Sequence, residues 1–232
     1  MKSRRCRSTA SGPPVRSDEL LQVVHEDAHL LVLHKPSGLL TIPGQSPTQQ
    51  DCLITRARQR WPDALIVHRL DQATSGLLIL ARGPAMQKTL SMAFEKRQVH
   101  KRYEAIVLGE PLEVPDPQGW NRIRLPMRID YQNRPRSIID YAHGKPSLTH
   151  WRPLGPGPWP GTTRLQLEPL TGRTHQLRVH LAAIGHPIVG DPLYASPEGL
   201  VLAPRLLLHA CALSFKHPVT GQPVSLSHPA PF

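Results

Sequence analysis

Cysteine is scarce in this chain of 232 residues, which contains three: Cys6, Cys52 and Cys211. They are too few and too scattered for a disulfide framework, and no two form the Cys-x-x-Cys pair typical of zinc sites. A reducing compartment, the cytoplasm, is therefore expected. Long hydrophobic runs are also lacking, since none approaches the ~20 apolar residues that a membrane span needs. No basic amphipathic helix with an aromatic face stands out either, so we expect a soluble protein.

The first residues lack the apolar core of a secretory signal, although residues 1–17 contain Arg4, Arg5, Arg7 and Arg16. We expect this segment to remain attached as a disordered basic tail, residues 1–19. An arm that lies along phosphates is the alternative. Residues 20–232 are long enough to bury one sizeable core, and we expect them to form a single domain.

Acidic residues are outnumbered, with 17 Asp and Glu against 28 Lys and Arg and a formal net charge of +11. Such an excess favours a polyanionic partner, and each neutralised phosphate makes binding fall with added salt. RNA fits this balance better than an acidic membrane surface does. A hydrolase is disfavoured because the sequence has neither a G-x-S-x-G elbow nor a cysteine and histidine pairing.

Hydrophobic periodicity predicts strands and helices in succession, without an internal repeat. Strands are expected at residues 29–34, 77–81 and 99–108, and a short helix at 52–60 with Asp51 as its cap. A second helix is expected to start at Pro84, with Met86, Leu90, Ala93 and Phe94 at helical spacing. Residues 148–154 and 162–168 are expected to form a hairpin around the Pro- and Gly-rich loop 155–161. A third helix is expected at 174–184, ended by Gly185.

Asp71 is the candidate for chemistry in this pattern. It lies between the basic pair His68-Arg69 and the apolar run 77–81, and Thr74-Ser75-Gly76 is expected to form the turn that presents it. An Asp in front of a turn often only bonds to its own backbone two residues on, and the local pattern favours that alternative.

Several motifs in order resemble the RluA family of pseudouridine synthases. The run His68-Arg69-Leu70-Asp71-Gln72-Ala73-Thr74-Ser75-Gly76 is similar to the family signature. The other similar segments are Lys35-Pro36-Ser37-Gly38-Leu39, Lys101-Arg102-Tyr103, Thr171-Gly172-Arg173-Thr174-His175-Gln176-Leu177-Arg178-Val179-His180, Gly185-His186-Pro187-Ile188, Gly190-Asp191 and Ala203-Pro204-Arg205-Leu206-Leu207-Leu208-His209-Ala210. The resemblance covers residues from about 20 to 232.

The resemblance implies an α+β protein with the pseudouridine synthase fold. That fold is a mixed, mostly antiparallel sheet in two lobes, flanked by helices, with a central catalytic cleft. The resemblance also implies an isomerase that needs no metal or organic cofactor. Without room for a separate S4-type domain, residues 20–232 are expected to recognise the RNA themselves.

The matching positions imply roles for individual residues. Asp71 corresponds to the family's nucleophile, Tyr103 to a residue that stacks on the uracil, and Arg178 to the partner of the Asp. Packing of Tyr103 in the core and contact of Arg178 with phosphate are the alternatives. Arg69 is expected to fill the space of a flipped base, or else to contact phosphate. The remaining candidates for RNA binding or base flipping are His68, Leu177, Arg173, His175 and Lys35, although Leu177 also suits the core.

Histidine is plentiful, with thirteen in all. His68, His175, His180 and His186 lie within the motifs, but His175 and His180 are five residues apart with no Glu between them, unlike a metal-binding helix. We therefore predict no metal site in this protein and attribute the motif histidines to RNA contact.

The short form of the chain most resembles dual-specificity members of the family. Asn133-Arg134-Pro135, Gly144-Lys145-Pro146 and Ala195-Ser196-Pro197-Glu198 support this similarity. It implies that the partners are a tRNA anticodon stem-loop, a hairpin of large-subunit (23S) rRNA, or both, bound by a monomer. The rival hypothesis is a non-catalytic basic RNA-binding module, which leaves Asp71 unexplained.

Overall fold

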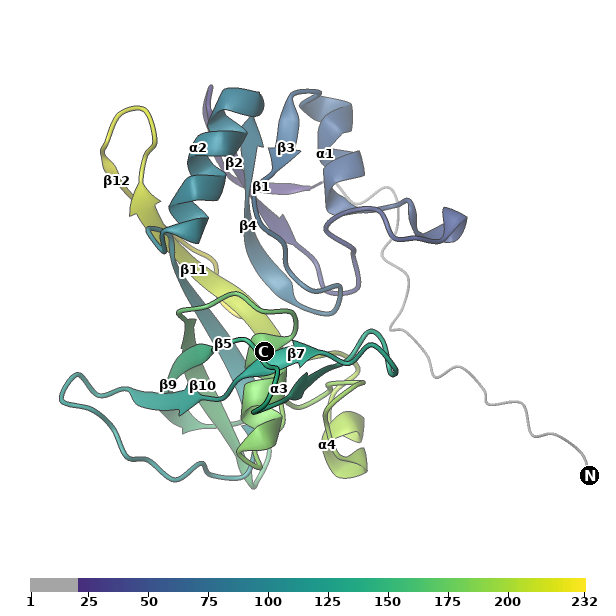
Figure 1. Ribbon diagram of the computed structural model, residues 1–232, viewed down its shortest axis with the longest axis vertical. Helices are drawn as coiled ribbons and strands as arrows, with labels where there is room; N and C mark the ends of the chain where they lie inside the picture. Colours follow the sequence, from purple (N-terminus) through teal and green to yellow (C-terminus); the bar gives the residue numbers. More distant parts are fainter. Residues whose placement is uncertain (1–20) are drawn as a thin grey trace, which may run out of the picture.

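The computed structural model describes residues 21–232, so the predicted basic tail lies outside the described residues (Figure 1). Ten strands form one sheet in the order β1-β2-β4-β11-β5-β10-β9-β6, with β3 beside β4 and β12 beside β11. These strands are β1 (Gln22–Glu26), β2 (Leu30–Lys35), β3 (Ala64–Ile66), β4 (Ser75–Arg82), β5 (His100–Leu108), β6 (Asn121–Arg124), β9 (Leu148–Pro156), β10 (Thr162–Pro169), β11 (Leu208–Lys216) and β12 (Pro223–Ser227). A separate hairpin pairs β7 (Met127–Ile129) with β8 (Ser137–Ile139).

Every strand pair named in the described sheet is antiparallel except β4 with β11, which run parallel. The predicted mixed, mostly antiparallel sheet is therefore confirmed. In Figure 1, β1 to β4 with two helices form the upper half of the molecule, and β5 to β10 with two helices form the lower half. The long strand β11 extends from one half into the other, which gives the two expected lobes.

Four α-helices flank the sheet in the described residues: α1 (Leu53–Arg60), α2 (Pro84–Glu95), α3 (Gln176–Ala183) and α4 (Pro197–Val201). A short 3-10 helix, Pro47–Gln49, precedes α1. None of these helices is both long and apolar enough to cross a membrane. The predicted start of α2 at Pro84 is confirmed, as expected for a residue whose missing N–H has no partner in the first turn.

The strands β2 and β4 are buried on both faces, which explains their uninterrupted apolar sequences. Alternate side chains point to opposite faces of a strand. Leu33 and Leu78 join the cluster that contains residues of α1 and α3, whereas Val32 and Leu77 join the cluster that contains Leu90 of α2. Burial of one such side chain contributes about 1.5–3 kcal/mol, so this central pair of strands is a firm base for the loop that precedes β4.

Two local predictions were wrong. Asp51 does not cap α1, because its carboxylate accepts charge-assisted hydrogen bonds of 2.8 and 2.7 Å from Nε and Nη2 of Arg56. The predicted turn at Thr74-Ser75-Gly76 lies earlier: the Thr74 N–H donates to the carbonyl of Asp71, and Ser75 already begins β4.

Helix α3 begins two residues later than predicted. His175 has a φ of +58°, a left-handed conformation that cannot belong to a right-handed helix. Gly185 follows the helix with a φ of +87°, which confirms its predicted role in ending the helix. The predicted hairpin is also confirmed, although β9 extends through Pro156 into the expected loop.

Candidate active site

Asp71 lies on a loop that is held in place by hydrogen bonds from the side chain of Lys35. The Lys35 side chain is fully buried, and its Nζ donates to the carbonyls of Pro36, Leu39 and Gln72 at 2.9, 2.7 and 3.1 Å. The Gly38 N–H also donates to the Gln72 carbonyl. Lys35 therefore lies under the loop that carries Asp71 and does not line the cleft, so the structure favours a structural role over the predicted RNA contact.

Replacing Lys35 by Met is expected to destabilise the protein, since the length and volume of the side chain are kept while three carbonyls lose the hydrogen bond from Nζ. Loss of such buried hydrogen bonds costs roughly 2–4 kcal/mol, which corresponds to a fall of about 4–16 °C in the thermal midpoint of a domain of this size. Thermal unfolding followed by circular dichroism measures this change. Lys88→Met on the exposed side of α2 is the control. An unchanged midpoint for Lys35→Met contradicts the role of Lys35.

Arg178 from α3 faces Asp71, as the resemblance implied, but its main partner is another carboxylate. Its Nε and Nη2 each donate to Asp191 at 2.7 Å, while Nη1 lies 3.5 Å from Oδ2 of Asp71. The side chain of Arg178 is 3% exposed and that of Asp191 is 0% exposed. Burial acts to lower the pKa of Arg178, but the bonds and charge of Asp191 raise it above its usual value. The guanidinium is therefore a fixed charge beside Asp71.

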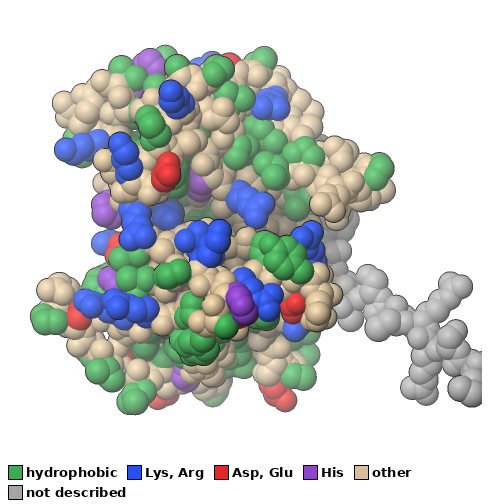
Figure 2. Space-filling view, in the orientation of Figure 1, with side chains coloured by type: hydrophobic (Ala, Val, Ile, Leu, Met, Phe, Trp, Pro, Cys, Tyr) green, Lys and Arg blue, Asp and Glu red, His purple; other side chains and the backbone are tan. Residues whose placement is uncertain are grey.

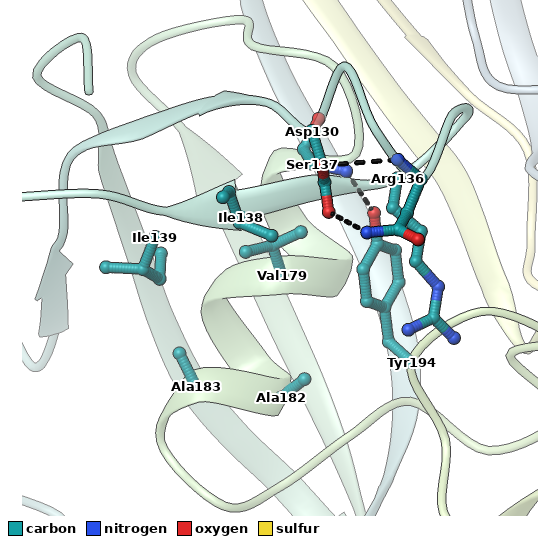
Figure 3. Close-up of a pocket in the computed structure, with 10 residues that line it drawn as sticks. Asp130, Arg136, Ser137, Ile138, Ile139, Val179, Ala182, Ala183 and Tyr194 are labelled. Atoms are coloured by element: carbon teal, nitrogen blue, oxygen red, sulfur yellow. Dashed lines mark hydrogen bonds between the residues drawn. The ribbon is translucent and has the colours of Figure 1, made fainter. Parts of the chain in front are cut away.

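His175 approaches Asp71 from the other side, with Nε2 3.9 Å from Oδ2 of the carboxylate. Its Nδ1 lies 2.8 Å from the hydroxyl of Tyr194. Figure 3 shows that this hydroxyl points at the backbone of Ser137, whose N–H donates to it at 2.7 Å. The Tyr194 oxygen accepts from Ser137 and can donate its own hydrogen to Nδ1 of His175. In that tautomer the N–H of a neutral His175 lies on Nε2, the nitrogen nearer Asp71.

Burial lowers the pKa of His175, although the charge of Asp71 opposes the shift. Because the pKa of His175 lies below its usual value, the ring is neutral at pH 7. His175 is therefore a neutral ring beside Asp71 and not a cation for phosphate, which differs from the role expected from its basic character.

Tyr103 of β5 and Leu177 of α3 supply an apolar wall. Both side chains are buried, and both line the same cavity as Asp71. Burial, and then the charge of Asp71, raise the pKa of the Tyr103 phenol above its usual value. The phenol therefore stays neutral at any physiological pH, and its ring can offer a face to a planar base.

The cavity that holds these groups has a volume of about 870 Å³. Eight of the nine predicted site residues line it, Lys35 being the exception: His68, Arg69, Asp71, Tyr103, Arg173, His175, Leu177 and Arg178. Arg97 and Lys101 add further positive charge. Figure 2 shows Lys and Arg side chains gathered along the boundary between the two halves of the molecule. A cleft of this size and charge suits part of a nucleic acid chain.

The basic side chains at the rim of the cavity differ in exposure and in the number of their hydrogen bonds. Arg69 and Arg173 are exposed, and Arg69 has a single long contact of 3.4 Å from Nη2 to Oγ1 of Thr174 among the described bonds. His68 is held instead: its Nε2 accepts from the Ile79 N–H at 2.9 Å and its ring stacks on Phe94. Burial lowers the pKa of His68 to about 3, so its ring is neutral and supports the wall.

Sequence reasoning missed Asp191 and Tyr194 as parts of the site. Asp191 was noted within the pair Gly190-Asp191, but no role was assigned to it, and Tyr194 was not singled out. The carboxylate of Asp191 also accepts from the backbone N–H groups of Leu193 and Tyr194, so this turn fixes both residues at once. The signal that could have found Asp191 is its place inside a family-like motif.

Comparisons with known proteins show which family the chain is similar to. The family model described as RNA pseudouridylate synthase matches residues 29–183. The dual-specificity RNA pseudouridine synthase RluA of Pasteurella multocida (strain Pm70) is 42% identical over 220 residues, covering 95% of this chain and 97% of that protein. RluA of Escherichia coli (strain K12) is 42% identical over 91% of this chain and 94% of that protein.

A solved structure extends the similarity to the fold. Human RNA Pseudouridylate Synthase Domain Containing 1 has a TM-score of 0.76 and 32% identity, with 95% of this chain and 87% of that chain covered. The predicted fold class is therefore confirmed. The residues matched by the family model include Asp71, Tyr103 and Arg178, which meet in one cleft. The chain belongs to the RNA pseudouridylate synthase family.

Proposed function

We propose that Asp71 is the nucleophile of this isomerase, which converts uridine to pseudouridine within RNA. The observation that carries the proposal is a partly exposed carboxylate in a basic cleft, between a buried arginine and a neutral histidine. The glycosidic bond between C1′ and N1 breaks, the uracil turns, and C1′ bonds to C5. Loss of the C5 proton and gain of a proton at N1 then complete an isomerisation without redox change. Asp71 either attacks C1′ or takes up the 2′ proton, and both routes need it ionised.

Arg178 supplies a fixed positive charge beside the carboxylate of Asp71. A positive charge within about 4–6 Å favours a carboxylate and opposes the effect of burial. Because both guanidinium bonds at Nε and Nη2 go to Asp191, the charge near Asp71 stays in place whether or not RNA is bound. The third nitrogen, Nη1, remains available to the carboxylate of Asp71.

Tyr103 and Arg69 act on the base. The phenol ring of Tyr103 lies in the cavity with Asp71 and stacks on the uracil, near the C5 atom that loses its proton. A base inside a stem must be flipped out to reach this cavity, at a cost of a few kcal/mol. The exposed Arg69 lies next to Asp71 and fills the space that the base leaves, and Arg173 contacts phosphate.

His175 positions the carboxylate of Asp71. Its Nε2–H is held toward Oδ2 by the bond from Tyr194 to Nδ1, so a small closure of the 3.9 Å gap gives Asp71 a second donor. The two donors, from Arg178 and His175, approach the same oxygen and leave Oδ1 for the sugar.

The variant Tyr194→Phe is expected to lower kcat about tenfold while KM for RNA changes little. One positioning hydrogen bond is worth about 1–1.5 kcal/mol, which corresponds to a factor of about ten in rate. Single-turnover kinetics on an RNA hairpin separate the two quantities. Tyr141→Phe, a change at an exposed tyrosine, is the control. A Tyr194→Phe enzyme with the parent's kcat contradicts this role of His175.

The substrates proposed are a tRNA anticodon stem-loop and a hairpin of large-subunit rRNA. The support is the dual specificity named for the RluA relatives, which cover nearly the whole chain. Residues 21–232 are proposed to act as a single catalytic domain, in a monomer, in the cytoplasm.

Release of tritium from 5-tritiated uridine in tRNA and rRNA transcripts tests this function, because the label at C5 is lost only if C5 bonds to the sugar. Release from both transcripts is expected. Release from one transcript alone supports the isomerase activity but contradicts the dual specificity. If the protein binds both RNAs in a salt-sensitive way and releases nothing from either, the non-catalytic binding module is the better description.

A further inference from the structure

Three histidines from separate segments meet on the side of the sheet opposite Lys35. His34 lies on β2, His209 on β11, and His228 directly after β12. One nitrogen of each ring lies within 4.8 Å of one nitrogen of each of the others. Since alternate residues of a strand face opposite ways, His34 points away from the catalytic loop that its neighbour Lys35 supports. The cluster is separate from the active site.

We propose that His34, His209 and His228 bind a zinc ion. Zinc takes imidazole nitrogens at about 2.0–2.1 Å in tetrahedral geometry, so two ligand nitrogens lie about 3.3–3.4 Å apart. The distance between Nε2 of His209 and Nδ1 of His228 is 3.2 Å, already close to that value. Three protein ligands leave the fourth position for water.

His34 supplies the third ligand. Its Nε2 is the one side-chain nitrogen or oxygen among residues 21–232 that is buried without a hydrogen-bond partner. An orphaned buried nitrogen is costly, and a metal ion would satisfy it. The His34 ring now stacks on that of His228 at 4.2 Å, with an angle of 13° between the planes. A side-chain rotation that breaks the stacking is needed to turn Nε2 toward the ion.

The protonation states suit a metal. Burial lowers the pKa of His34 to about 4 and that of His209 to about 3, so both rings are neutral at pH 7. Nδ1 of His209 lies 2.9 Å from Oγ of Ser75, which can accept its proton and leave Nε2 with a free lone pair. Nδ1 of His228 also lies 3.1 Å from the carbonyl of Pro229, so a bound ion must displace that contact.

The neighbouring charges decide which metal can bind. Arg205 donates from Nη2 to Ser75 at 3.0 Å and adds a positive charge beside the cluster. No carboxylate belongs to the cluster, so Mg²⁺ and Ca²⁺, which need oxygen ligands, are excluded. Three imidazoles are a ligand set that suits zinc. A bound ion would link β2 and the segment after β12 to β11. Its ligand on β11, His209, pairs with Ser75, the first residue of β4.

Zinc titration against a chromogenic chelator tests the proposal with the full chain. A Cys6→Ser background removes the one cysteine that lies outside the described residues, while Cys52 and Cys211 are buried. The parent is expected to bind one equivalent. His34→Asn and His228→Ala are each expected to weaken binding more than about tenfold, the loss that even an outer-shell change causes. His143→Ala, at an exposed histidine, is the matched control and should change nothing.

Two further readouts make the result decisive. Co²⁺ in place of zinc should give the visible absorption of a four-coordinate ion, and both triad variants should lose it. Zinc at a hundredfold excess over Kd should raise the thermal midpoint of the parent by roughly 5–10 °C and leave His34→Asn unchanged. Circular dichroism shows whether the variants are folded. Zinc that binds the triad variants as tightly as the parent, or an absence of zinc binding by the parent, overturns the proposal.

Discussion

Asp71→Asn is expected to lower the rate of pseudouridine formation by on the order of 10⁴-fold or more, as for other enzymes that lose their nucleophile. The amide has the shape of the carboxylate but is neutral, so it can neither attack C1′ nor take up a proton. Tritium release from 5-tritiated RNA under single-turnover conditions measures the loss. Glu113→Gln, an exposed acid outside the cleft, is the control and should retain the parent's rate.

The same variant should keep its fold and its affinity for RNA. Arg178 retains both bonds to Asp191 when Asp71 loses its charge, so no buried cation is left alone. Removal of a negative charge from a cleft that binds phosphates should leave affinity unchanged or slightly higher. Tritium release by Asp71→Asn within tenfold of the parent's rate contradicts the assignment. Loss of RNA binding together with activity would instead indicate a damaged cleft.

Local sequence patterns predicted the elements that carry the site. The apolar run within β4, the proline that starts α2 and the glycine after α3 each act within a few residues, so spacing alone reveals them. Asp51 shows where this reasoning stops. A helix cap contributes about 1 kcal/mol, and the two charge-assisted bonds from Arg56 to Asp51 are stronger. Helix-capping preferences do not indicate that such a competing partner is present.

Long-range placement could not be predicted from local patterns. Ser75 pairs with His209 across 134 residues in the parallel ladder of β4 and β11. That pairing joins the two lobes, yet the sequence of neither strand indicates which strand lies beside it. The meeting of His34, His209 and His228 has the same origin, since spacing rules examine histidines close in sequence. The roles of Asp71, Tyr103 and Arg178 came from the resemblance, and the structure adds the distances that make those roles chemically reasonable.

Asp191 was missed for an energetic reason. An acidic residue is almost never fully buried unless it is paired, so a sequence pattern places it at the surface by default. Here the side chain is 0% exposed and binds Arg178 twice. The buried guanidinium of Arg178 beside Asp71 needs Asp191 as a partner of its own. A sequence motif does not show that two of its residues form such a pair.

Asp191→Ala is expected to be among the most damaging single changes for stability. Removal of one partner of a buried pair leaves an uncompensated charge, at a cost of roughly 3–5 kcal/mol. For a domain of this size the thermal midpoint should fall by about 6–20 °C. Urea and thermal unfolding measure the loss. Glu113→Ala is the control, and a midpoint for Asp191→Ala within 2 °C of the control's, about the shift expected from less than 1 kcal/mol, contradicts the argument.

A double variant separates the two functions of the pair. Replacing a buried ion pair by apolar residues of similar volume is often neutral or stabilising. Arg178→Met combined with Asp191→Leu should therefore recover most of the stability that Asp191→Ala loses. Tritium release should remain low in the double variant, because Asp71 no longer has a fixed cation 3.5 Å away. Recovery of both stability and activity would mean that the charge of Arg178 is dispensable for catalysis.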